Sequence, residues 1–159
     1  MVLAATRALT PAQKPAAVTR RTAVAALALG GTLASPARAR RRKAAEQLRQ
    51  AVFGAVSDDA TVAGALLRLA FHDAVRRADG QTRGADGSIQ YEIPDAENVR
   101  LGRPLALVLS LKPDALSVAD AVVVAGAAAV EASGGPRIAI GLGRRDASAA
   151  APAVLRRPI

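Results

Sequence analysis

The sequence predicts a mainly α-helical fold. Apolar residues recur at helical spacing in several segments, and Ser or Asp residues stand where these segments begin. Pro and Gly residues stand where the same segments end. Hydrophobic residues make up 51% of the 159 residues, but there is no Trp, one Tyr and two Phe, so Ala, Val and Leu must fill the core.

Residues 1–39 are predicted to be a targeting segment. They hold five Lys or Arg residues and no acid, which is typical of an organelle transit peptide. Arg20 and Arg21 then lead into a short apolar run, and Ala37 and Ala39 form the small-x-small pattern that signal peptidases cut. A twin-arginine signal after a transit peptide is the two-part address of chloroplast proteins bound for the thylakoid lumen. The alternatives are a bacterial periplasmic export signal and an Ala-rich segment without a targeting role.

Two helices are predicted at the start of the domain that follows, residues 40–147. Apolar residues at helical spacing from Lys43 to Val56 indicate an amphipathic helix. The Ser-Asp-Asp sequence at residues 57–59 offers caps for a second helix, from Ala60 to about Val75. Residues 76–91 are charged and rich in glycine, and are therefore predicted to form a loop.

Two more helices are predicted in the second half of the chain. One runs from residue 97 or 99 to residue 111, and the other, over residues 119–132, follows a capping-box-like start at Ser117. The small residues of the latter would let neighbouring helices approach closely. Residues 137–146 alternate as a short strand or an extended segment, and residues 148–159 are predicted to be an unstructured tail.

The composition excludes several classes of function. The absence of Cys excludes disulfides, cysteine-ligated zinc and thiol catalysis. The net charge is +9, but residues 40–159 hold 17 Lys or Arg against 13 acids, which leaves only about +4 there. Because there are almost no aromatic residues to stack on bases, no nucleic-acid partner is expected. The apolar run near the N-terminus is too short to span a membrane.

A polar pair interrupts the apolar second helix, in the sequence "LLRLAFHDA" of residues 66–74. Arg68 and His72 are four residues apart and therefore share one face, with Phe71 beside them and Asp73 on another side. Burying an unpaired guanidinium is costly, so this face must meet solvent or a polar cavity. One interpretation is an exposed edge of a surface helix. The other is a site for a small polar oxygen species, in which His acts as acid and base and Arg stabilises negative charge.

The same nine residues resemble the distal haem-pocket helix of the plant, fungal and bacterial haem peroxidase superfamily, whose pattern is Arg-x-x-aromatic-His-Asp. The similarity continues through "GADGSIQYE", "PDAENVRL" and "LSVADAVVVAGAAAVEASGGPRIAIGLGRRDA", and so covers about residues 66–147. The absence of Cys and the plastid-like address favour the ascorbate peroxidase-like members. "GADGS" and "LGRRDASAA" are more similar to the fungal manganese and lignin peroxidases. The resemblance implies an incomplete distal domain of the peroxidase type, without the proximal domain.

The resemblance also implies the chemistry. It implies haem b as the cofactor, hydrogen peroxide as the oxidant and a small molecule as the reductant. His72 would then be the acid and base, Arg68 would stabilise the leaving hydroxide, and Phe71 would be the distal aromatic residue. Asn98 would accept the other N–H of His72 and so fix its tautomer. An N-cap of the following helix is the alternative role for Asn98.

A calcium site is a further implication of the resemblance. Asp73, Gly84, Asp86 and Ser88 match the positions that hold the distal calcium in fungal and secretory peroxidases. Carboxylates, a hydroxyl and backbone carbonyls are the hard oxygen ligands that Ca²⁺ requires. A turn rich in Gly, Asp and Ser that binds nothing is the competing interpretation.

The proximal histidine that holds haem iron in this superfamily has no counterpart here, because His72 is the only histidine. Three explanations are open. The chain is a fragment or truncated form of a whole peroxidase, or a haem-free lumenal scaffold that binds a protein partner, or a calcium-binding protein. We favour the fragment, and the 159 residues alone are expected to bind little or no haem.

Overall fold

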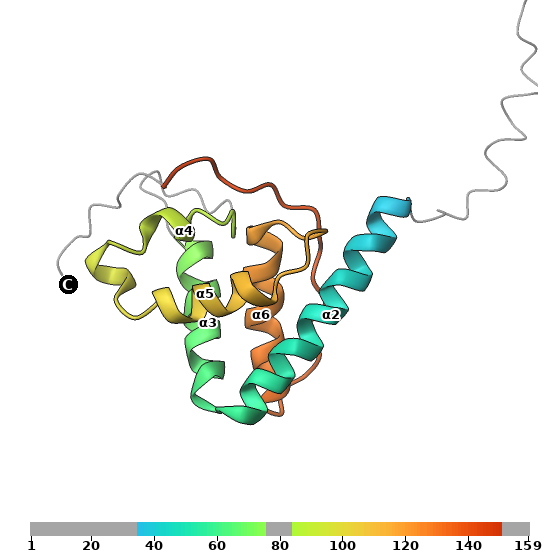
Figure 1. Cartoon of the computed structure of the whole chain (residues 1–159), viewed down its shortest axis with the longest axis horizontal. Coiled ribbons are helices and arrows are strands. Elements are labelled where there is room, and N and C mark those ends of the chain that lie inside the picture. The colour runs from blue at the N-terminus through green and yellow to red at the C-terminus, as the bar shows by residue number, and fades with distance from the viewer. Residues whose placement is uncertain (1–34, 76–83, 151–159) are drawn as a thin grey trace, which may run out of the picture. The chain divides into compact units, whose positions relative to one another are not determined.

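The computed structural model describes residues 35–75 and 84–150, all of which belong to one of the chain's two compact units, residues 34–159. The mainly helical prediction is confirmed, and the described residues contain no strand (Figure 1). The elements in chain order are the helices α2 (Pro36–Asp58), α3 (Thr61–Val75) and α4 (Ile89–Glu92), the 3-10 helix η1 (Ala96–Asn98), and the helices α5 (Gly102–Leu111) and α6 (Val118–Ala132). No helix within these residues is both long and apolar enough to cross a bilayer.

Helix α6 lies at the centre of the core, against α2 and α3 (Figure 1). Most of its side chains are buried, and the core is completed by aliphatic residues of the other helices, among them Leu48, Val52, Leu66, Leu69 and Val108. A Cβ atom at Gly126 would lie only 2.6 Å from Cβ of Ala70 in α3. The prediction that small residues of α6 allow close approach is therefore confirmed, and this approach fixes α3 on the core.

Helix α2 is longer than predicted, because it begins at Pro36 rather than at Lys43. The Ser35 hydroxyl accepts a hydrogen bond from the backbone N–H of Arg38 (3.3 Å), and proline is favourable at the first helical position. The predicted targeting segment therefore includes the first turn of α2, while residues 1–34 lie outside the described part of the chain.

The cap predicted before the second helix is provided by Asp59. Its Oδ1 accepts hydrogen bonds from the backbone N–H and the hydroxyl of Thr61, at 2.9 and 2.6 Å. These bonds, of which the one from the hydroxyl is the stronger influence, lower the pKa of Asp59. Helix α3 accordingly starts one residue after the predicted position and ends at Val75 as predicted.

The third predicted helix is interrupted. The backbone forms η1 up to Asn98, leaves helical geometry at Val99 and Arg100, and forms α5 only from Gly102. Arg100 has φ of 70°, a left-handed conformation that is unfavourable for a residue with a Cβ atom. The interruption lets Asn98 point into the protein from the end of η1, where it is almost completely buried.

Candidate active site

The outward side of α3 carries three of the predicted site residues. Leu66, Leu69 and Asp73 face the core, whereas Arg68 and Phe71 are exposed and His72 is half-buried. The four-residue spacing brings Arg68 and His72 to the same side of the helix. The ring of Phe71 meets that of His72 edge to face, with 6.0 Å between ring centroids.

Asn98 holds His72 from a different element. Its Oδ1 lies 2.8 Å from Nδ1 of His72, and its Nδ2 donates a hydrogen bond to the backbone carbonyl of Glu92 at 2.7 Å. A carbonyl can only accept, so the amide nitrogen must face Glu92 and the amide oxygen must face His72. In the neutral ring, Nδ1 is then the protonated nitrogen and Nε2 keeps its lone pair. Asn98 ends η1 and does not begin a helix, so its alternative role as an N-cap is wrong.

Arg68 makes contacts that sequence reasoning missed. Its guanidinium donates to the backbone carbonyls of Val99 (2.9 Å) and Glu97 (3.0 Å), which flank Asn98. A guanidinium has five N–H donors, so these two bonds leave others for a ligand. No local sequence signal marks this contact, because the partners are 29 and 31 residues away. Arg68 thus holds the segment that presents Asn98 to His72.

Of the four residues of the predicted calcium site, Asp73 lies near the C-terminal end of α3. Gly84, Asp86 and Ser88 lie in the loop before α4. The carboxylate of Asp73 is buried and accepts hydrogen bonds from the backbone N–H groups of Gly87 (3.0 Å) and Ile89 (3.2 Å). Asp86 accepts from the backbone N–H of Ser88 at 3.1 Å. Gly84 has φ of 73°, which suits a residue without a Cβ atom, and no described contact joins it to Asp73.

Asp73 therefore already holds the loop through backbone amides. Burial raises its pKa, and the two amide hydrogen bonds only partly oppose this effect, while the nearby Asp86 adds to it. Within residues 35–75 and 84–150, no group of three His, Cys, Asp or Glu side chains could hold a metal ion. The catalytic and calcium-binding roles assigned from the sequence stay predictions.

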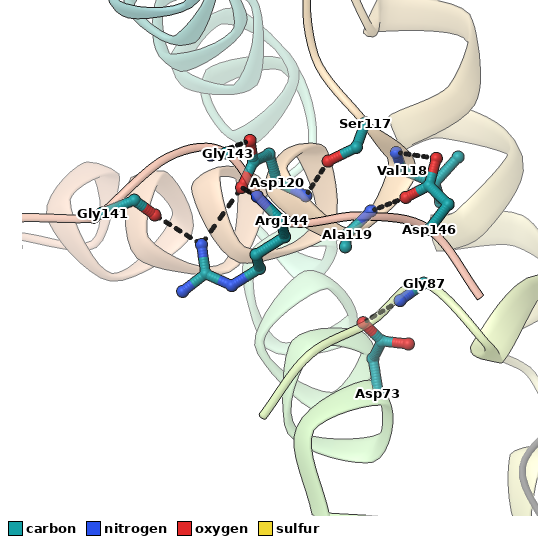
Figure 2. A network of polar contacts seen from close by, with 10 residues as sticks. All are labelled: Asp73, Gly87, Ser117, Val118, Ala119, Asp120, Gly141, Gly143, Arg144 and Asp146. Carbon is teal, nitrogen blue, oxygen red and sulfur yellow. Dashed lines mark hydrogen bonds and ion pairs between the residues drawn. The ribbon is translucent and has the colours of Figure 1, made fainter. Parts of the chain in front are cut away.

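A second polar network caps the N-terminal end of α6 (Figure 2). The carboxylate of Asp146 accepts hydrogen bonds from the backbone N–H groups of Val118 (2.9 Å) and Ala119 (2.8 Å). The hydroxyl of Ser117 accepts from the N–H of Asp120 at 3.0 Å. Ser117 is therefore the N-cap that the sequence predicted, but the carboxylate that assists it comes from Asp146, far along the chain.

Asp120 holds the segment that was predicted as a short strand or an extended segment. Its buried carboxylate accepts from the backbone N–H groups of Gly143 (2.7 Å) and Arg144 (3.2 Å), and from the guanidinium of Arg144 (3.2 Å). The segment forms no strand because its backbone is held by side chains instead (Figure 2). The backbone N–H of Ala147 then donates to the carbonyl of Asp86 at 2.7 Å, which links this segment to the loop after α3.

The outward side of α3 carries exposed apolar residues beside the polar pair. Leu67, Phe71 and Val75 are spaced four residues apart and are each about half exposed, so they form an apolar strip beside Arg68 and His72. Such a strip would hold a flat apolar ring such as that of haem, next to Arg68 and His72. The 159 residues offer no second histidine and no cysteine as a ligand for the iron.

Comparison with known proteins identifies the family of the chain. Residues 48–158 match the peroxidase family. The chain is 40% identical over 111 residues to Peroxidase 18 of Arabidopsis thaliana, which covers 62% of this chain and 32% of that protein. It is 39% identical over 98 residues to "L-ascorbate peroxidase 5, peroxisomal" of the same plant, covering 58% and 35%. The chain spans about a third of the length of these curated relatives.

Proposed function

The chain belongs to the peroxidase family, and we propose that it supplies the peroxide-binding side of a haem peroxidase, an oxidoreductase that reduces hydrogen peroxide with electrons from a small reductant. The observation that carries the proposal is the Asn98–His72 contact, which leaves Nε2 of His72 as a hydrogen-bond acceptor on an open face. An acceptor nitrogen in this position is what a general base for peroxide requires.

Haem, when bound, would supply the iron at which the O–O bond of peroxide breaks. Nε2 of His72 accepts a proton from one peroxide oxygen and returns it to the departing oxygen. The N–H donors of Arg68 that the loop carbonyls leave unused stabilise the negative charge on that oxygen. Asn98 positions the imidazole throughout, because the proton on Nδ1 stays in its hydrogen bond.

The whole protein must provide the ligand for the iron. His72 cannot serve, because a histidine bound to iron could not also exchange a proton with peroxide. We propose that a histidine in a segment beyond these 159 residues holds the iron, and that the reductant is a small molecule of the ascorbate class. The similarity to an L-ascorbate peroxidase supports this reductant.

The experiment uses the haem-loaded whole protein. His72→Leu should slow the reaction with hydrogen peroxide by roughly 10²- to 10⁴-fold, as expected for loss of a general base, with the haem absorption retained. Leu109→Ala, an exposed aliphatic residue of α5 to which the site assigns no role, should leave the rate within its order of magnitude. If His72→Leu reacts at the rate of the unchanged protein, the assignment of the base is wrong.

We propose the thylakoid lumen as the location, with the bacterial periplasm as the alternative. Support comes only from residues 1–39, where a twin-arginine pair follows a basic segment without acids. A fluorescent protein fused behind these residues should reach the thylakoid lumen when expressed in plant cells. Retention in the cytosol would contradict the thylakoid lumen.

Calcium binding is a separate proposal for the loop after α3. It is supported by Asp86 and Ser88 on that loop, and by Asp73, whose carboxylate is close enough for Asp86 to influence its pKa. Added calcium should raise the melting temperature of the chain, and the increase should vanish in Asp86→Asn. An unchanged melting temperature would contradict calcium binding, and the loop would then be a turn held by Asp73 alone.

A haem-free scaffold that binds a lumenal protein partner is the second candidate function. The single histidine favours it, because the chain by itself offers the iron no ligand. A whole transcript that encodes a further histidine beyond residue 159 would favour the peroxidase, and a verified stop codon after Ile159 would favour the scaffold. A strong Soret band from the 159-residue chain after addition of haem would contradict the scaffold.

A further inference from the structure

The first turns of α2 carry a dense group of cations. Arg38, Arg40, Arg41, Arg42 and Lys43 are all exposed, and the first turn contains no acid. None of these five side chains makes a hydrogen bond or an ion pair with another residue in the described part of the chain. The end of α2 that carries them projects beyond the other helices (Figure 1). The group is therefore available to a partner.

A groove runs between this end of α2 and residues 137–142. Two adjoining hollows of about 350 and 300 Å³ form it, and they share Arg42, Ile140 and Leu142 as lining residues. Arg38 and Arg41 line the first hollow. One wall of the groove is thus cationic and the other is aliphatic. We call it the basic groove.

The acids near the basic groove are already paired. Glu46 receives a hydrogen bond from Arg137 at 2.7 Å, and the buried Glu131 is paired with Arg49 beneath the second hollow. The charges of these two pairs cancel, so Arg38, Arg41 and Arg42, which line the groove, leave it positively charged.

None of the five cations stabilises α2 through a side-chain hydrogen bond or an ion pair within the described residues. The N-terminal end of a helix is positive and this effect is confined to the first turn, so only Arg38 is disfavoured by it. The five cations also precede residues 48–158, the part that matches the peroxidase family. A group of charges that has no partner within the described residues and lies outside the family match indicates a function particular to this chain.

We propose that the basic groove binds the surface of an anionic lipid membrane. Arginine and lysine side chains contact acidic headgroups, and each contributes about 1 kcal/mol near such a surface, while aliphatic side chains can enter the interfacial layer. Ile138 beside the groove is 39% exposed, and Ile140 and Leu142 line it. Nucleic acid fits less well, because base stacking requires aromatic side chains and none lines the groove.

Vesicle binding by the 159-residue chain tests this proposal without haem, so its outcome is separate from that of the peroxidase assignment. The chain should bind phosphatidylcholine vesicles that contain about one third phosphatidylglycerol and should not bind pure phosphatidylcholine. Arg41→Gln with Arg42→Gln should lower the partition coefficient by roughly 30-fold, because two cations are lost at about 1 kcal/mol each.

Two control variants test whether the loss of vesicle binding is specific to the position and the charge of Arg41 and Arg42. Arg100→Gln with Arg103→Gln removes the same charge beside the opposite end of α2 and should change binding less than about twofold. Arg41→Lys with Arg42→Lys keeps the charge and should keep most of the binding. The proposal is overturned by equal binding to neutral vesicles, by equal losses in the two Gln variants, or by tighter binding to DNA at the same phosphate concentration.

Discussion

The inward and outward sides of α3 use polar residues in opposite ways. On the inward side, both oxygens of Asp73 accept backbone hydrogen bonds and the carboxylate is buried. On the outward side, His72 is held through one nitrogen only, and Arg68 uses only part of its guanidinium. Adjacent residues of one helix thus differ: Asp73 holds the fold, and His72 keeps a nitrogen that no described contact uses. A polar group whose bonding capacity is used up supports structure, and one with capacity left can do chemistry.

Asp73→Ala should give the largest change on the inward side. It leaves the N–H groups of Gly87 and Ile89 without their acceptor, which should lower the free energy of unfolding by about 2–3 kcal/mol. Urea denaturation measures this. Phe71→Ala, an exposed change on the outward side, should stay within about 0.5 kcal/mol. Equal losses of unfolding free energy in Asp73→Ala and Phe71→Ala would contradict the distinction between the inward and outward sides of α3.

Glu131→Gln should give an intermediate change that depends on pH. Burial tends to raise the pKa of Glu131, but the N–H of Ile138 and the guanidinium of Arg49 outweigh it and lower that pKa below its ordinary value. The ionised form is therefore stabilising at neutral pH, and this contribution is lost as the pH falls through the lowered pKa.

The free energy of unfolding of Glu131→Gln should thus be lower by about 1–2 kcal/mol at neutral pH, from the lost charge on a hydrogen-bonded pair. The difference from the unchanged protein should narrow as the solution becomes acidic. A difference that stays constant across the acid range would show that the charge of Glu131 contributes nothing.

Arg100→Gly should give the smallest change, and a stabilising one. Arg100 follows the segment held by Arg68 and has φ of 70°, which a glycine adopts without steric cost. The variant should gain about 0.5–1 kcal/mol in the free energy of unfolding, measured by the urea midpoint. A loss of stability would mean that the Arg100 side chain has a structural role.

Local patterns were sufficient to predict α3, α6 and the shared face of Arg68 and His72, because these follow from helical spacing within a few residues. The same patterns missed the early start of α2 at Pro36. The N-cap Ser35 lies in a stretch whose composition resembles a signal peptide. These residues were therefore assigned to the targeting segment rather than to the start of a helix.

Long-range contacts account for the other differences between the sequence predictions and the structure. Asp120 and Asp146 hold residues 143–146 against the start of α6, over separations of 23 to 28 residues. Alternation in residues 137–146 predicted a strand or extended segment. The described residues contain no strand there, and Asp120 accepts from the backbone N–H groups of Gly143 and Arg144. The break between Asn98 and Gly102 was missed for a similar reason, since Arg68 and His72 define it from another helix.

The tautomer of His72 tests the central claim most directly. Nitrogen-15 NMR of the imidazole in the 159-residue chain, at a pH where the ring is neutral, distinguishes a proton on Nδ1 from one on Nε2. The Asn98 contact predicts the proton on Nδ1, with Nε2 unprotonated, and a mixture of both forms in Asn98→Ala. A proton on Nε2 in the unchanged chain would contradict the account, because His72 could then not accept a proton from peroxide.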